Sequence, residues 1–104
     1  DNTQSYLSGA KMANNQSYEI PITQLKEILS ALAKENGNDH SKSANLAADG
    51  LEVLVRNEAT LPQSPEYLPL RKQVLGYVAG CLKDSRTRKI IEERAVLIYD
   101  PAAA

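Results

Sequence analysis

Only a few side chains in this sequence have the chemistry that catalysis or metal binding requires. The chain holds one histidine, His40, and one cysteine, Cys81. A zinc site takes three or four ligands, which a single His in a polar loop cannot supply. Cys81 lies near the carboxyl end of an apolar helical stripe, where the helix dipole disfavours a thiolate. We therefore expect His40 to be an exposed loop residue and Cys81 to pack in the core.

Two pairs of carboxylates, Asp49 with Glu52 and Glu92 with Glu93, are close enough in sequence to share a ligand. In helical bundles, acids hold paired metal ions when Glu-x-x-His motifs complete the site, and the sequence has no such motif. We interpret these acids as solvent-facing. The sequence thus predicts no catalytic residue, no cofactor and no metal ligand, and we expect a non-enzymatic protein.

Three features are better suited to contact with another protein. Two glycines one helical turn apart expose a strip of backbone, used either for tight packing inside the fold or for a partner helix. A basic cluster is either a solvated helix end or a docking surface for an acidic protein. Two apolar residues near the N-terminus dock either on their own domain or on another protein. The candidate partner-binding residues are the glycines Gly76 and Gly80, the basic residues Lys83, Arg86, Arg88 and Lys89, and the N-terminal residues Tyr6 and Leu7.

Composition narrows the class of partner. With 104 residues, 42% of them hydrophobic and 24% charged, the chain is typical of one folded domain. Residues 1–60 carry a net charge of −3 and residues 61–104 a net charge of +2, too little to favour nucleic acid. The apolar runs are too short for a transmembrane segment, so any membrane association is expected to be peripheral, through a membrane complex. We expect the partner to be a larger protein or protein complex.

Apolar residues recur with helical spacing in four stretches. Two boundaries stay open. Residues 65–68 either begin the third helix or form a separate turn, because Pro69 lacks a backbone donor. Residues 96–99 either continue the last helix or leave it as an extended segment. The predicted helices cover residues 22–35, 43–59, 69–83 and 86–98.

Local signals refine these helices. Ser41 or Ser43 is predicted to cap the second helix, and Asp84 or Ser85 the last one. Gly50 should weaken the second helix by about 1 kcal/mol relative to Ala. Two ion pairs one turn apart are predicted in the last helix: Arg88 with Glu92, and Lys89 with Glu93.

Helices joined by short loops favour an all-α fold, a small antiparallel up-down four-helix bundle. An extended N-terminal arm should precede it, because the residue before Pro21 is driven out of helical geometry. The expected organisation is an arm over residues 1–21, a helical bundle over 22–99 and a tail over 100–104.

Between Leu51 and Lys83 three short runs stand out: Tyr67-Leu68, Leu70-Arg71-Lys72-Gln73-Val74 and Gly76-Tyr77. On these residues the chain resembles the extrinsic four-helix proteins of photosystem II, particularly the PsbQ-like group. That resemblance implies a non-catalytic accessory subunit docked on a membrane complex in the thylakoid lumen. The same stretch is similar to small helical immunity proteins that block toxins of bacterial type VI secretion.

The first residue, Asp1, is not a methionine, so either a targeting segment has been removed or the sequence has been trimmed. We favour a processed protein of an organelle lumen or exported compartment. The leading hypothesis is therefore a protein-binding module that serves as an extrinsic subunit, associated with a photosystem. The alternative is a small inhibitor or chaperone that binds an effector enzyme in the bacterial cytoplasm.

Overall fold

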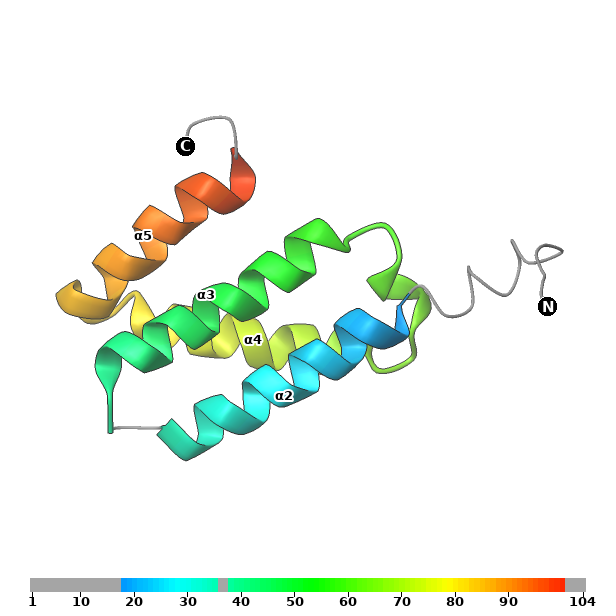
Figure 1. The fold of residues 1–104 in the computed structure, drawn as a ribbon, viewed down its shortest axis with the longest axis horizontal. Helices are drawn as coiled ribbons and strands as arrows, with labels where there is room; N and C mark the ends of the chain where they lie inside the picture. Colours follow the sequence, from blue (N-terminus) through cyan, green and yellow to red (C-terminus); the bar gives the residue numbers. More distant parts are fainter. Residues whose placement is uncertain (1–17, 36–37, 101–104) are drawn as a thin grey trace, which may run out of the picture.

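The computed structural model describes residues 18–35 and 38–100, and within these ranges it contains helices and no strand. This confirms the predicted all-α fold with four α-helices. Residues 1–17 of the expected N-terminal arm, with Tyr6 and Leu7, lie outside the described residues, whereas residues 19–21, predicted to be extended, are helical. The elements are α2 (Glu19–Glu35), α3 (His40–Arg56), the 3-10 helix η1 (Leu61–Gln63), α4 (Tyr67–Cys81) and α5 (Ser85–Tyr99) (Figure 1).

Helix α3 lies at the centre of the bundle, because α2, α4 and α5 all pack against it. Successive helices alternate in direction, so α5 returns alongside α3 and runs the same way (Figure 1). The core is aliphatic, as a chain without Phe or Trp requires. Its buried members are Ile22, Leu25, Leu29, Leu32, Ala47, Ala48, Leu51, Leu54, Leu61, Leu70, Val74, Val78, Ile91 and Ile98.

Two helices begin earlier than predicted, because a proline is tolerated in the first turn of a helix. Helix α2 begins at Glu19, and Pro21 lies in its first turn, where backbone N–H groups have no partner within the helix. For the same reason α4 begins at Tyr67 and includes Pro69, instead of starting at that proline. Helix α5 continues to Tyr99, so the extended alternative for residues 96–99 is wrong.

The start of α3 is set by an aspartate and not by a serine. Asp39 is the N-cap, and its Oδ1 accepts a hydrogen bond from the backbone N–H of Lys42 at 3.0 Å. The prediction of Ser41 or Ser43 as the cap is therefore wrong. Helix α3 ends at Arg56, three residues before the predicted end.

Gly50 brings α3 and α4 close together. A Cβ at this position would lie 3.0 Å from Cγ1 and 3.3 Å from Cγ2 of Val74, and 3.7 Å from Cγ2 of Ile28. Val74 is fully buried, so it has little room to move aside. The lower helix propensity of Gly50 is therefore offset by a close contact between helices that a larger side chain would obstruct.

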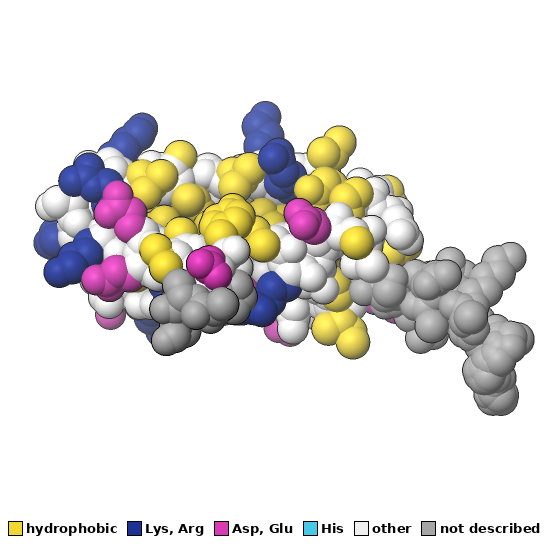
Figure 2. All heavy atoms as spheres, turned by 90° about the horizontal axis from the view of Figure 1, so that it is seen from above, with side chains coloured by type: hydrophobic (Ala, Val, Ile, Leu, Met, Phe, Trp, Pro, Cys, Tyr) yellow, Lys and Arg dark blue, Asp and Glu magenta, His cyan; other side chains and the backbone are white. Residues whose placement is uncertain are grey.

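The surface includes an apolar end of α5. Val96, Leu97 and Tyr99 are exposed to 55%, 44% and 65%, which leaves the last turn of this helix apolar on several sides. Figure 2 shows apolar side chains gathered along the middle of the face that carries α5. None of the described helices has the length and hydropathy needed to cross a lipid bilayer.

The two helical glycines of α3 and α4 should respond in opposite ways to the same substitution. Gly50→Leu should lower the free energy of unfolding by about 1–3 kcal/mol, because the side chain meets Val74. Gly76→Leu should keep or raise it by up to about 1 kcal/mol, because its Cβ meets no atom within 4 Å. Urea unfolding followed by circular dichroism measures both. Equal effects of the two variants would contradict the close α3–α4 contact.

Candidate functional site

A groove of about 370 Å³ lies where α2 and α4 end and α3 and α5 begin. Four sequence segments converge on it, and they bring together side chains that the sequence analysis treated separately. The lining residues are Leu32, His40, Ser43, Gly76, Tyr77, Gly80, Cys81, Asp84 and Thr87. This end of the bundle is the candidate functional site.

Gly76 and Gly80 form an open strip on one wall of this groove. Both residues are exposed, and a Cβ added at either one would meet no atom within 4 Å. The interpretation that these glycines serve tight packing inside the bundle is therefore wrong. The glycine that serves this purpose is Gly50, which the sequence analysis considered only for its helix propensity.

The groove holds a His, a Cys, a Ser and an Asp, but they do not form an activated nucleophile. His40 is exposed and is the first residue of α3, not part of the loop. Cys81 is half-buried at the edge of the core, and this burial raises the pKa of its thiol, which favours the unreactive protonated form. Within the described residues, no hydrogen bond joins His40 to Cys81, Ser43 or Asp84.

The turn between α4 and α5 is closed by two side chains of the groove wall. The buried hydroxyl of Thr87 lies within hydrogen-bonding distance of the carbonyl oxygens of Cys81 and Asp84. Of the two predicted caps, Asp84 and Ser85, Asp84 is the N-cap of α5, and its Oδ1 accepts from the backbone N–H of Arg86 at 2.9 Å. Hydrogen bonds from Arg86, first from its side chain and then from its backbone, lower the pKa of Asp84 to about 2. This carboxylate is thus committed to holding the turn.

The basic cluster surrounds the same end. All four cations are exposed, and Figure 2 shows Lys and Arg side chains gathered at the end of the molecule where α5 begins. Arg86 is bound to Asp84 through an Nη2–Oδ2 contact of 2.9 Å. Among the described residues no carboxylate pairs with Lys83, Arg88 or Lys89, so the ion pairs predicted with Glu92 and Glu93 are not formed.

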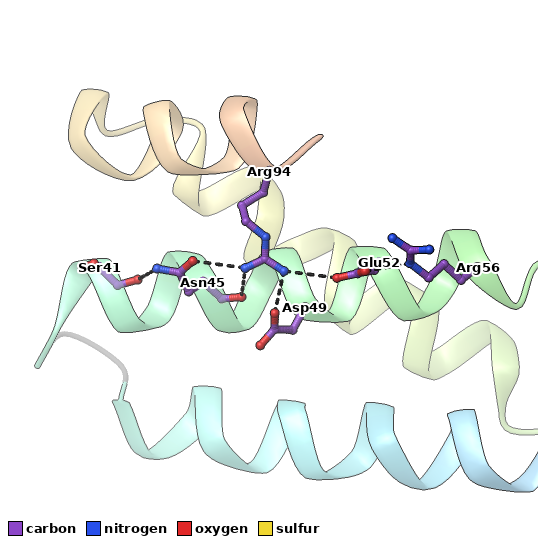
Figure 3. Close-up of polar contacts among 6 residues, drawn as sticks. All are labelled: Ser41, Asn45, Asp49, Glu52, Arg56 and Arg94. Atoms are coloured by element: carbon purple, nitrogen blue, oxygen red, sulfur yellow. Dashed lines mark hydrogen bonds and ion pairs between the residues drawn. The ribbon is translucent and has the colours of Figure 1, made fainter. Parts of the chain in front are cut away.

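Helix α5, one wall of the groove, is held on α3 by Arg94 (Figure 3). Its Nη2 lies 2.6 Å from Oδ1 of Asp49 and 3.3 Å from Oε1 of Glu52. Its Nη1 donates to Oδ1 of Asn45 at 3.1 Å. The other oxygen of Glu52 accepts from Nε of Arg56 at 2.6 Å.

Asp49 and Glu52 are therefore not a simple solvated face, as the sequence analysis interpreted them. Asn45, Asp49 and Glu52 follow the spacing of one helix face, and this signal was available in the sequence. The sequence could not show that Arg94 is the cation that contacts this face, because that depends on how α5 packs along α3. No group of three or more His, Cys, Asp or Glu residues that could hold a metal occurs in the described ranges.

Comparison with known proteins gives one partial similarity. The chain is 41% identical over 44 residues to a protein named cell division topological specificity factor, from the bacterium Hydrogenovibrio crunogenus. The match covers 41% of this chain and 52% of that protein, so the chain spans about half the length of the curated relative that it matches. No protein-family model and no solved structure matches the chain.

This similarity overturns several expectations. The resemblance to PsbQ-like proteins is wrong, and with it the photosystem, the extrinsic subunit and the thylakoid lumen or exported compartment, because the match is to a bacterial cell-division factor. The alternative of an immunity-type inhibitor or effector chaperone does not agree with this match either. The relative is named as a factor and not as an enzyme, which agrees in part with the expectation of a non-enzymatic protein.

Removing the Arg94 side chain should loosen α5. Arg94→Ala should lower the free energy of unfolding by about 1–2 kcal/mol, because three partners on α3 lose a charged donor. The matched control is Arg56→Ala, which removes only a pair within one helix and should cost about 0.3–0.5 kcal/mol. Urea unfolding of both variants measures the difference. Equal losses would show that Arg94 does not fasten α5.

The Asp84 carboxyl should titrate far below its ordinary value of 3.8, with a midpoint of about 2. A pKa depressed in the folded state stabilises the fold above the ordinary value, and this stabilisation is lost as the pH falls through about 2. Carboxyl-carbon NMR measures the midpoint. Arg86→Gln should move it upward, because the first cause of the shift is removed; an unchanged midpoint would contradict this assignment.

Proposed function

We propose that this chain is a non-catalytic factor that acts on the placement of bacterial cell division by binding another protein. The observation that carries the proposal is the 41% identity over 44 residues to a cell division topological specificity factor. The name of that relative describes a factor for where division takes place. The match covers about half of that protein. We therefore propose for this chain only a role in placing division, and not the full activity of the relative.

The geometry supports action through contact. In the groove, Asp84 caps α5 and Thr87 closes the turn before it, and burial raises the pKa of the Cys81 thiol. The same end carries an open groove and exposed cations, which are features that recognise another surface. Function is argued from these features and from the similarity, since a small helical bundle alone is compatible with many functions.

Expression of the chain in a rod-shaped bacterium tests the proposal. The chain should shift division septa away from the positions seen in cells that carry the empty vector. Fluorescence microscopy of a septal marker, plotted as septum position along the cell axis, measures the shift. The Hydrogenovibrio relative, expressed in parallel, shows that the host responds to a factor of this kind.

A pair of variants shows whether the septum shift depends on the groove. Gly76→Leu places a side chain in the groove without a clash in the fold and is the test variant. Ala79→Leu adds apolar bulk at an exposed position of α4 that does not line the groove and is its control. Protein levels are matched by immunoblotting. Unchanged septum positions with the wild-type chain, in a host that responds to the relative, would contradict the proposed function.

A further inference from the structure

We propose that the groove at the start of α3 and α5 binds an acidic amphipathic helix of the partner protein. The apolar side chains of that helix would enter the groove, and its carboxylates would face the cations around the α4–α5 turn. The inference rests on the proposed function, in which the chain acts by binding a protein, and it names the binding surface and the chemical class of the partner.

The groove has the form that a helix requires. Leu32, Tyr77 and Cys81 give it an apolar lining, and its volume of about 370 Å³ is enough for an inserted Leu or Phe side chain. Gly76 and Gly80 stand along one wall without side chains, with open space above them. A second backbone can therefore approach α4 closely at this strip.

The electrostatics of this end select an acidic occupant. Helices α3 and α5 both begin here, and the N-terminus of each carries the positive end of a helix dipole. Neither helix has an acidic residue in its first turn. Three carboxylates at this end are already engaged: Asp39 and Asp84 cap the two helices, and Glu35 pairs with Lys42 at 3.1 Å. Glu92 and Glu93 lie one turn further along α5, away from the lining residues of the groove.

Unpaired cations stand beside the groove wall. Lys83 and Arg88 are the chain neighbours of the lining residues Asp84 and Thr87. Both cations are exposed, and neither meets a carboxylate among the described residues. Cations near the N-terminus of α5 lie at the positive end of the helix dipole, which is electrostatically unfavourable. An acidic partner that covers them would relieve this repulsion and so bind more favourably.

A protein helix fits this surface better than a membrane does. Binding to a lipid surface uses apolar side chains that project from an amphipathic helix into the bilayer. Here the apolar surface is concave and Gly76 and Gly80 project nothing, so a flat surface would touch the cations and leave the groove empty. A partner helix meets both features at once.

A display library of helical peptides about twenty residues long tests the inference. Its members carry apolar residues at the i, i+3, i+4 and i+7 positions, and Glu or Lys is allowed at random elsewhere. Peptides that bind the wild-type chain should be enriched in Glu. Their affinity should fall strongly between about 0.05 M and about 0.5 M salt, because exposed charges are screened.

Variants of the chain separate the two parts of the site. Lys83→Glu and Arg88→Glu should each weaken the selected peptides at least about threefold, and together at least about tenfold. Arg71→Glu, an exposed charge reversal elsewhere on α4, should leave affinity unchanged. Gly80→Leu should weaken binding at least about tenfold by filling the groove, whereas its neighbour in sequence, Ala79→Leu, should have no effect.

Several results would overturn the inference: selection of Lys-rich peptides, no binding peptide at all, or affinity that Gly80→Leu does not alter. Vesicles of phosphatidylcholine with about a quarter phosphatidylglycerol are tested in parallel. Binding to them that is lost in the charge reversals but kept in Gly80→Leu would assign this end to a lipid surface instead. A septum shift that survives both kinds of variant would contradict this inference while leaving the proposed function in place.

Discussion

The close packing of α3 against its three neighbours is the contact on which the rest of the structure depends. Small residues make it feasible: Ala44, Ala47 and Ala48 are fully buried, and Gly50 lets Val74 of α4 approach within the space that a Cβ would occupy. At these positions α3 itself contributes little apolar area. The larger apolar side chains of the core come from Leu51 and Leu54 of α3 and from the aliphatic residues of α2, α4 and α5 that pack against it.

The same packing positions the candidate site. With α3 at the centre and successive helices alternating in direction, the start of α3 and the start of α5 come to the same end. Arg94 fastens α5 along α3 through Asp49, Glu52 and Asn45, and this contact keeps one wall of the groove in place. Asp84 and Thr87 at the start of α5 then line the same groove as Gly76 and Gly80 of α4. The candidate site is thus a consequence of helix packing and not of any one motif.

The comparison with known proteins changes the biological setting more than the physical description. A match to a bacterial division factor over 44 residues replaces the photosystem setting, since generic resemblance between amphipathic helices carries little information about function. The structural features that favour a binding protein lie on its surface: an open groove, and exposed cations of which Lys83, Arg88 and Lys89 form no ion pair among the described residues. These structural features are the same whether the chain is compared with photosystem proteins or with a division factor.

The sequence by itself determined the helices. Apolar spacing identified four of them, and the cap at Asp84 was recognisable, because helix formation depends on neighbours three or four residues apart. The sequence could not distinguish the role of Gly50 from that of Gly76 and Gly80. All three lie in helices, and they differ only in whether a neighbouring helix packs against them. The sequence also missed the Arg94 contacts, whose partners are more than forty residues away. Tertiary structure alone decided which glycine is packed and which is open, because that depends on the distance between helices and not on the chain nearby.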